Sequence, residues 1–445
     1  MPGGNNEVTP LQYELIEAWP EINQLNPEIN AIDKLVSWEI HPSIDTVGRT
    51  GILSLSSPLK VSSGVFSSIR ALKLKGIGLR DQNGNICPPT IEPYYRANPH
   101  IGITRTGEFC PVPSAPAPMG GITVTRAIQE YRNSCILTKN GCPSQVPVRL
   151  YRYLDTTMVF NPDKSISDFL GVVVSGLPNF IDFRADTALR YEFADAQTRK
   201  LLDQLATDLK IINAENVGLA ILSKTYNLFG TTLRKFSMSG LYRYSGTPDN
   251  LSFSSEINQV FLMDLDSSLE LSECSSTEKP LQVMRDVASA LFHLAAFILN
   301  PKYIESFPVN QVCDEAPFYK FLSAYYHDVS SELIYKISLI YQNHYLHMYS
   351  NAFKNRKFSP SPKRDDETFQ EYWLRAYKQH WINREETYSL LMAILWVLHD
   401  KSELAIYFPH ELTQDKLYDN LATYSSTSIM RKIKAQINYV TQISD

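Results

Sequence analysis

Short strand-like runs of mixed apolar and polar residues dominate the first third of the chain. They lie at 50–54, 67–75 and 146–154, and each predicts a strand. Gly171-Val-Val-Val174 is continuously apolar instead, which is typical of a fully buried strand. One helical pattern interrupts these strands, because the apolar residues between 123 and 137 recur on one face.

Beyond about residue 180 the spacing of apolar residues becomes helical. Helices are predicted over 194–211, 215–229, 281–299, 318–353, 366–382 and 384–398. Near the other end, 11–39 predicts a short helical extension punctuated by proline, and the Pro-rich segment 81–119 predicts a long loop without regular structure. A strand-rich first third followed by a helical remainder is typical of a bilobal α+β enzyme.

Composition and charge limit the partners of such a chain. Its 445 residues suffice for two or three packed units, and 44% hydrophobic with 20% charged residues is an ordinary globular composition. A net charge of -5 gives no electrostatic basis for binding nucleic acid or an anionic membrane. The first residues do not resemble a signal peptide, and the longest strongly apolar stretch, 390–398, is too short to span a bilayer. We therefore expect a cytoplasmic protein without nucleic-acid or membrane partners, while secretion as an effector stays open.

Acidic and amide side chains flank the apolar run 260–263. Asp249 and Asn250 lie on a turn before it, and Asp264 and Asp266 follow it. In kinase-type phosphotransferases a loop acid takes a proton from the attacking hydroxyl, while an amide and a second acid supply hard oxygen ligands to Mg²⁺. The pattern predicts a base at Asp249 and metal ligands at Asn250 and Asp264, with Asp266 as a further or better ligand.

The upstream half of such a site is also present. Lys75 ends a predicted strand and is followed by Gly76 and Gly78. A lysine there offers a compact positive charge to nucleotide oxygens, and glycines let backbone amides approach phosphates. Glu130 lies in the middle of the predicted helix, where it can hold Lys75 by an ion pair or simply face solvent. Together with the downstream acids, these residues follow the chain order that kinase chemistry uses.

With these motifs the chain resembles the protein-kinase-like fold and, within it, the selenoprotein O family of protein AMPylators. The matching blocks are Lys73-Leu-Lys75-Gly-Ile-Gly78, similar to the family's Leu-Lys-Gly-x-Gly; Arg126-Ala-Ile-Gln-Glu130-Tyr, similar to its Ser-Ser-Ile-Arg-Glu-Phe; and Thr247-Pro-Asp249-Asn250-Leu-Ser252, similar to its Asn-Thr-Asp-Asn-Met-Ser. A fourth block, 171–183, follows the outline of Gly-Ala-Val-x-Arg-Val-Ala-Pro-Ser-x-Ile-Arg-Phe. The blocks cover 67–268 discontinuously, less than half of the chain.

The resemblance implies a role for each matching residue. Lys75, with its two glycines, binds nucleotide phosphates, Glu130 holds Lys75, Asp249 is the base, and Asn250 and Asp264 bind Mg²⁺ or Mn²⁺. In its fourth block the family has two arginines that hold the phosphates of a nucleotide bound in reversed orientation. This chain has Ser175 and Asp182 at those places, and the nearby Arg184 is the candidate substitute.

We therefore expect an ATP- and Mg²⁺-dependent transferase, in the first place a protein adenylyltransferase that modifies a hydroxyl of a protein or peptide. Transfer of the γ-phosphate and adenylation-dependent glutamylation stay open on the same scaffold. A nucleotide-binding pseudokinase that acts as an interaction module is a further alternative, as is dependence on a protein activator. The fold expected is a bilobal kinase-like one, with an N-terminal helical extension at 1–45, an N-lobe at 46–178 that includes the 81–119 insertion, a C-lobe at 179–300 and a helical region at 301–445.

Overall fold

A computed structural model describes residues 10–44, 49–80, 84–91, 93–94, 100–103, 109–112, 117–161, 166–178, 185–357, 361–367, 369–376 and 378–407, and isolated positions beyond. The chain divides into two compact units. Unit 1 comprises Met1–Arg96, Ser114–Asp182 and Asp264–Ser268, and unit 2 comprises Ala97–Pro113, Phe183–Met263 and Leu269–Asp445. The finer four-part division expected from the sequence stays a prediction.

Unit 1 is built on an antiparallel sheet. Its strands run in the order β1 (Tyr13–Ala18), β11 (Val146–Asn161), β12 (Ile166–Leu177), β3 (Ser68–Lys75) and β2 (Thr50–Lys60), and β10 (Ile122–Thr123) also pairs with β12. All four predicted strands are present, and β2, β11 and β12 extend beyond the predicted bounds. The valines of β12 are buried, as the continuous apolar run predicts for a central strand covered on both faces.

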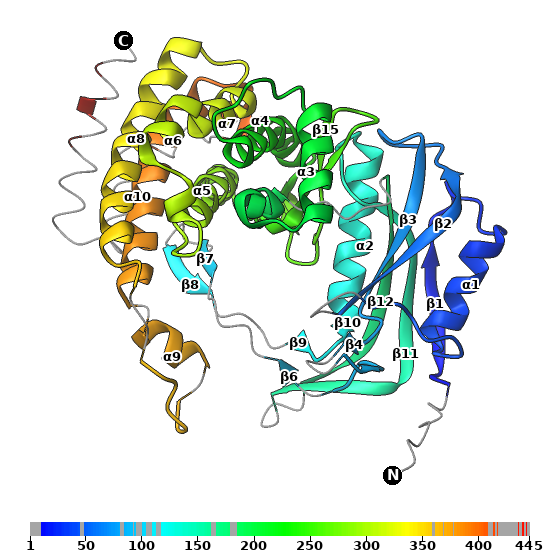
Figure 1. Cartoon of the computed structure of the whole chain (residues 1–445). Coiled ribbons are helices and arrows are strands. Elements are labelled where there is room, and N and C mark those ends of the chain that lie inside the picture. Colours follow the sequence, from blue (N-terminus) through cyan, green and yellow to red (C-terminus); the bar gives the residue numbers. More distant parts are fainter. Residues whose placement is uncertain are drawn as a thin grey trace. The chain divides into compact units, whose positions relative to one another are not determined.

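Two helices cover opposite faces of this sheet (Figure 1). Helix α2 (Val124–Lys139) begins at Thr123, whose side chain caps the Arg126 N–H, and buries Ala127 and Tyr131 in an apolar cluster with residues of β10, β11 and β12. Helix α1 (Pro27–Val36) begins with a proline at its first turn, where no N–H is needed. Helix α2 thus presents one face to the sheet, and that face also carries Glu130.

Residues 11–39 are only partly helical. The prediction holds for α1 but is wrong for β1, where six residues form an edge strand against β11. In Tyr-Glu-Leu-Ile-Glu-Ala, apolar and polar residues do not alternate. The segment is an edge strand whose two faces are both partly exposed, so neither face needs to be apolar. Its conformation is decided by backbone pairing with a strand more than a hundred residues away.

The Pro-rich segment also departs from the prediction of an irregular loop. Its described residues form short antiparallel ladders: β4 (Leu79–Arg80) with β5 (Ile86–Cys87) and β6 (Pro93–Tyr94) with β9 (Ala117–Pro118) in unit 1, and β7 (His100–Ile103) with β8 (Phe109–Val112) in unit 2. Proline cannot donate a ladder hydrogen bond, but a two-stranded ladder leaves alternate N–H groups pointing outward. The prolines therefore made the segment resemble an irregular loop in the sequence, although they do not prevent these short strands from forming.

Unit 2 is mostly helical, as predicted. Its α-helices are α3 (Ala196–Asp208), α4 (Val217–Met238), α5 (Glu278–Ile298), α6 (Val309–Glu315), α7 (Pro317–Tyr325), α8 (Ser331–Lys354), α9 (Phe369–Ala376) and α10 (Lys378–Asp400). The single helix expected over 318–353 is wrong, because the chain leaves helical geometry between α7 and α8. There Asp328 accepts hydrogen bonds from Arg234 (2.9 Å) and the Glu403 N–H (2.6 Å), contacts that hold a turn in place.

Unit 2 also carries two small strand pairs. They are β13 (Leu241–Tyr242) with β16 (Leu269–Glu270), and β14 (Leu251–Ser254) with β15 (Gln259–Leu262); the 3-10 turn η3 (Pro248–Asn250) leads into β14. The β14–β15 hairpin therefore begins directly after Asp249 and Asn250 and ends two residues before Asp264.

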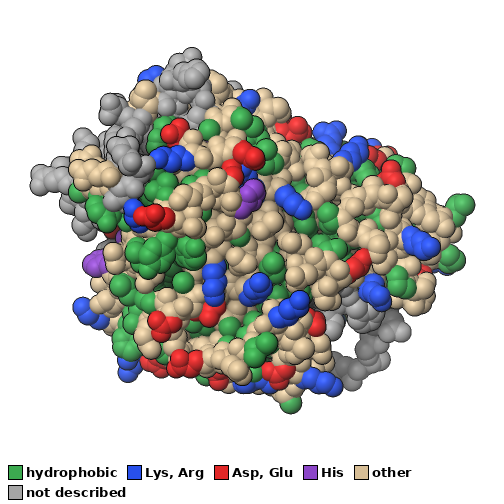
Figure 2. Space-filling model, turned by 90° about the horizontal axis from the view of Figure 1, so that it is seen from above, with side chains coloured by type: hydrophobic (Ala, Val, Ile, Leu, Met, Phe, Trp, Pro, Cys, Tyr) green, Lys and Arg blue, Asp and Glu red, His purple; other side chains and the backbone are tan. Residues whose placement is uncertain are grey.

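Helix α5 is long and apolar enough to cross a bilayer by length and composition, a feature that sequence inspection overlooked. Within the protein, 83% of its most apolar 18-residue stretch is buried, and a helix in a protein core meets the same criteria of length and composition. On the face seen in Figure 2, acidic and basic side chains are interspersed among neutral ones, in keeping with the near-balanced composition.

Candidate functional site

A buried ion pair joins the sheet of unit 1 to helix α2. The Lys75 Nζ at the end of β3 lies 2.5 Å from the Glu130 Oε2, and both side chains are almost fully buried. Lys75 faces α2 because it pairs across the sheet with Val173, which belongs to the apolar cluster under that helix. The sequence prediction of a strand lysine held by a helix glutamate thus agrees with the geometry.

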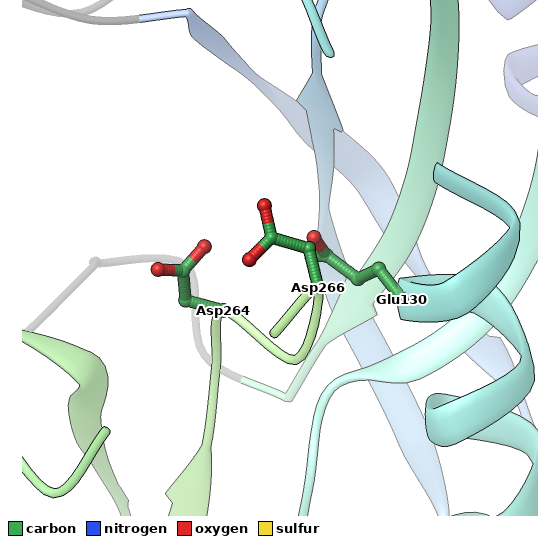
Figure 3. Close-up of side chains that lie close together, drawn as sticks. All are labelled: Glu130, Asp264 and Asp266. Atoms are coloured by element: carbon green, nitrogen blue, oxygen red, sulfur yellow. The ribbon is translucent and has the colours of Figure 1, made fainter. Parts of the chain in front are cut away.

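Two further carboxylates form ion pairs with the same ammonium. Asp264 also contacts the Lys75 Nζ, and the Asp266 Oδ2 lies 3.2 Å from it. Figure 3 shows Asp264 and Asp266 on one loop and Glu130 on α2, with their carboxyl groups turned toward one another. Arg49 adds a second cation, 3.1 Å from Asp266. Asp266, left without a definite role by the sequence, is therefore a buried partner of two cations.

Helix α2 positions both halves of this cluster. One turn after Glu130, the Asn133 Nδ2 donates to the carbonyl oxygens of Leu265 (2.8 Å) and Ser268 (2.9 Å), so the turn that carries the aspartates is tied to the helix. Asp264 itself has a left-handed backbone (φ 59°), which aspartate tolerates better than most residues.

A buried amide holds the second oxygen of Glu130. The Gln145 Nε2 donates to Glu130 Oε1 (2.7 Å), and the Gln145 Oε1 accepts from the Lys73 Nζ (3.4 Å). Since Gln145 occupies Oε1, the Oε2 atom of Glu130 is left to face Lys75. Gln145 therefore orients the glutamate.

The mutual arrangement decides the charge state of the cluster. Burial acts to lower the pKa of Lys75, but the carboxylates of Asp264, Asp266 and Glu130 outweigh it, so its pKa is raised and the ammonium stays charged. Burial acts to raise the pKa of each aspartate, but Lys75 reverses this effect, and the pKa values of Asp264 and Asp266 lie below the ordinary one. At neutral pH Lys75, Asp264 and Asp266 are therefore ionised.

These carboxylates also suit a hard cation. Ligand oxygens of Glu130, Asp264 and Asp266 all lie within 4.8 Å of one another, and carboxylate oxygens are the ligands that Mg²⁺ prefers. Lys75 already supplies positive charge between them. Asp264 is the member open to solvent, with 29% of its side chain exposed against none for Glu130. The donor set therefore fits a magnesium ion, with Asp264 as the carboxylate that it reaches.

In unit 2, Asp249 carries an uncommitted oxygen. Its Oδ1 is buried and has no hydrogen-bond partner among the described residues. Buried polar atoms are normally paired, so an unpaired carboxylate oxygen is a candidate for contact with a ligand or a substrate proton. Its charge also acts on the buried Tyr226 hydroxyl: burial first, and then Asp249, raise the pKa of Tyr226.

Asn250 is fixed by the hairpin that it begins. Its Nδ2 donates to the Ser245 carbonyl oxygen (3.2 Å), and its own carbonyl oxygen accepts from the Met263 N–H (3.2 Å). The Tyr244 hydroxyl lies between the carbonyl oxygens of Asn250 (2.8 Å) and Met263 (3.1 Å). These bonds hold the two ends of the β14–β15 hairpin together, immediately before the chain reaches Asp264.

A buried acid anchors the loop that precedes Asp249. The Asp286 Oδ2 on α5 accepts from the Tyr244 N–H (3.3 Å), next to Arg243, whose backbone is left-handed (φ 66°). Burial raises the pKa of Asp286 to about 6, although Arg285 opposes the shift from 2.9 Å. No motif marks Asp286 in the sequence, because it lies within an apolar helical pattern.

The glycines after Lys75 are engaged in the sheet rather than open. The Gly76 N–H donates to the Arg49 carbonyl oxygen (2.6 Å), and the Gly78 N–H donates to that of Gly120 (3.0 Å). A Cβ at Gly76 would lie 2.5 Å from the Gly171 carbonyl oxygen, where its φ is also +94°. In this structure the two glycines allow close backbone packing, and their amides are not available to phosphates.

The three positions compared with the family's fourth block have different outcomes. Ser175 lies buried in β12, directly opposite Lys73 on β3. Arg184 and Asp182 lie outside the described residues. Of the predicted site residues, unit 1 brings together Lys75, Glu130, Asp264 and Asp266, while Asp249 and Asn250 belong to unit 2.

Sequence reasoning missed the supporting residues. Asn133 could have been noticed, because a residue three positions after Glu130 lies on the same helical face. Arg49 and Gln145 carry no local signal, since their roles come from pairing with residues far away in the chain.

Comparisons with known proteins do not assign this chain to a family. No family model matches the sequence, and no curated protein matches it. Among solved structures, one described as "WaaP in complex with acyl carrier protein" aligns with 78% of this chain and 100% of that chain, at 10% identity and a TM-score of 0.31. A likeness at this TM-score does not assign a fold family. The kinase-like fold and the resemblance to selenoprotein O therefore stay predictions.

Proposed function

We propose that this protein is an ATP- and Mg²⁺-dependent transferase that modifies a hydroxyl of a protein or peptide. The observation that carries the proposal is the buried Lys75–Glu130 pair at 2.5 Å, joined by Asp264 from the loop after β15. An ion pair of this kind costs desolvation energy and adds little stability by itself. Such a desolvation cost is expected where a lysine must be kept charged and in position to bind an anionic ligand such as a nucleotide phosphate.

In this proposal each group has a separate task. Lys75 neutralises nucleotide phosphate oxygens, and Glu130 keeps its ammonium in place. Asp264, with Asn250, supplies oxygen ligands for Mg²⁺, which when bound neutralises charge that develops on the phosphates. Asp249 accepts the proton of the attacking hydroxyl, a role for which its unpaired Oδ1 is suited.

The transferred group separates two forms of the proposal. Adenylyl transfer is the form that the family resemblance implies. Phosphoryl transfer is the second candidate, because the neutral Ser175 is buried within the sheet at a place where the family has a phosphate-binding arginine. The product distinguishes them: attack on the α-phosphate releases pyrophosphate and leaves AMP on the acceptor, whereas attack on the γ-phosphate releases ADP and leaves phosphate.

Incubation with ATP and Mg²⁺, followed by intact-mass measurement of the chain and by nucleotide analysis, tests the proposal. We expect pyrophosphate or ADP to form, and Asp249→Asn and Asp264→Asn to slow the formation of either product by about 10²-fold or more. Asp365→Asn is the matched control, because Asp365 is an exposed acid on a loop of unit 2. A glutamate adduct would indicate glutamylation instead. Tight ATP binding without any product, also with a protein extract as acceptor source, would refute the transferase and favour an interaction module.

A further inference from the structure

Unit 2 contains a hollow of about 490 Å³ that is unrelated to the acidic cluster. It lies between the end of α3, the start of α4 and the turn of the β14–β15 hairpin, and Asn258 of that turn is among its lining residues. The hairpin strands are four residues long, so this turn is about 13 Å from the hairpin end where Asn250 lies. The volume falls in the usual range of about 300–1,000 Å³ for small-molecule sites.

The charged side chains that line this hollow are net positive by one. Lys210, Lys224 and Lys320 line it, together with Glu215 and Glu315. The two acids are already engaged: Glu315 forms an ion pair with Lys320, and Glu215 accepts a hydrogen bond from Gln311 (2.7 Å).

Two ammonium groups therefore remain for a ligand. Lys210 and Lys224 form no ion pair within the described part of the chain. Two lysines at one hollow are the complement of a dianion, and a phosphomonoester carries a charge of about -1.5 to -2 at neutral pH. The lining amides of Asn213 and Asn258 add further hydrogen-bond donors.

The remaining wall is apolar. Leu209, Ile211 and Ala220 line the hollow beside the lysines. A bare ion would use the charged side only, whereas an organic phosphate would cover the apolar wall as well. A volume of about 490 Å³ is more than a single phosphate group fills.

The backbone at Lys210 is unusual for a lysine. It ends the α3 turn in the left-handed conformation (φ 57°), where the Ile211 N–H donates to the Ala206 carbonyl oxygen (2.9 Å). Glycine is the residue that this position of a helix end normally favours. A lysine at this position makes the folded protein less stable than a glycine would. The lysine, however, places an ammonium at the rim of the hollow.

We propose that this hollow binds a phosphomonoester carried on a small apolar body, with Lys210 and Lys224 holding the phosphate. The ligand is either a free organic phosphate or a phosphorylated side chain of a protein. The site uses no residue of the proposed transferase and does not depend on that activity.

Calorimetric titration with phenyl phosphate tests the site. We expect saturable binding that weakens with salt, and a loss of about tenfold or more in affinity when Lys224 is changed to Gln. Lys235→Gln is the matched control, because Lys235 is an exposed lysine near the other end of α4 and does not line the hollow. Its affinity should equal that of the unchanged protein.

Lys210→Gly gives a test that does not depend on a damaged fold. Because glycine suits the left-handed backbone, we expect the midpoint of thermal unfolding to stay equal or rise while phenyl phosphate binding falls about tenfold. Benzoate, which has the same ring and a single charge, should bind more weakly than phenyl phosphate. A tyrosine-phosphorylated peptide that binds more tightly than phenyl phosphate would identify a protein source, and weaker binding a small molecule.

Two results would overturn the proposal. One is the absence of phenyl phosphate binding to the folded protein. The other is binding that the Lys210 and Lys224 variants leave unchanged, or that the Lys235 control reduces equally.

Discussion

Replacing Lys75 by Met should convert the buried cluster from a closed ionic network into an uncompensated group of carboxylates. Lys75 is 3% exposed and contacts Glu130, Asp264 and Asp266 at once, so the variant leaves three acids within 4.8 Å of one another. The charges of Arg49, Lys73 and Arg126 still act on the aspartates but do not replace the ammonium between them. Removing one side of a buried ion pair costs about 3–5 kcal/mol. For a unit of 150–250 residues this lowers the unfolding midpoint by about 6–20 °C, at about 2–4 °C per kcal/mol.

The pH dependence of this loss has a definite sign. In the unchanged protein the pKa values of Asp264 and Asp266 are lowered, so their contribution to stability is present above the unfolded value and is lost as pH falls through the folded one. Without the ammonium, burial and mutual repulsion dominate and raise these pKa values. The Lys75→Met variant should therefore gain stability relative to the unchanged protein as the pH falls from 7 toward 4.5.

The same variant should respond to divalent cations. Its three carboxylates offer a hard-oxygen site, and a cation at a hundred times its dissociation constant stabilises the folded state by about 2.7 kcal/mol. Thermal unfolding followed by circular dichroism, with and without MgCl₂ and MnCl₂, measures this rescue. Lys60→Met, at an exposed lysine that ends β2, is the control and should show neither loss nor rescue. If Lys75→Met unfolds at the same midpoint as the control, with no response to pH or metal, the charge cluster does not form as described.

Three other outcomes follow from particular side chains. Asp249→Asn should lower kcat by about 10²- to 10⁴-fold and leave ATP affinity unchanged in an equilibrium binding assay, and an equal fall in both would show that Asp249 is not the base. Burial lowers the pKa of His399 to about 3, so the folded protein keeps this ring neutral and loses stability as pH falls from about 6.5 toward 3. His399→Leu should flatten urea midpoints measured between pH 7 and 4, and parallel curves for the two proteins would contradict this. Gly76→Ala should cost about 2–5 kcal/mol because backbone strain and a 2.5 Å contact with the Gly171 carbonyl oxygen add, whereas Gly84→Ala, with a similar φ and open space, should cost about 1–2 kcal/mol; equal urea-midpoint shifts would argue against the close contact.

The sequence predicted those helices and strands whose apolar residues form a recognisable local pattern along the chain. Helix α2 and strand β3 lie within a residue or two of their predicted bounds, because apolar residues recur at helical spacing in α2 and form a short strand-like run in β3. The edge strand β1 and the short ladders of the Pro-rich segment were missed. Their backbones are ordered by partners elsewhere in the chain, and their side chains show no matching pattern.

The candidate site divides in the same way. Residue types and chain order were enough to select Lys75, Glu130, Asp264 and Asp266. Asp264, for which the sequence predicted a metal role, forms an ion pair with Lys75, and the amides of Gly76 and Gly78 are occupied by backbone carbonyls. Gln145, which orients Glu130, is identified only by the fold, whereas Asn133, which holds the aspartate loop, lies at a helical spacing from Glu130 that the sequence already contains.

The sequence by itself determined which ionisable groups are available and on which kinds of element they lie, since helix and strand periods are local properties of the chain. Only the tertiary structure decided that Lys75 meets Glu130, 55 residues away, and Asp264, 189 residues away. Electrostatic energy depends on distance and on the exclusion of water, and neither quantity can be read from spacing along the chain. Folding brings the charges together and removes their solvent, so it is folding that turns four separate residues into one coupled site.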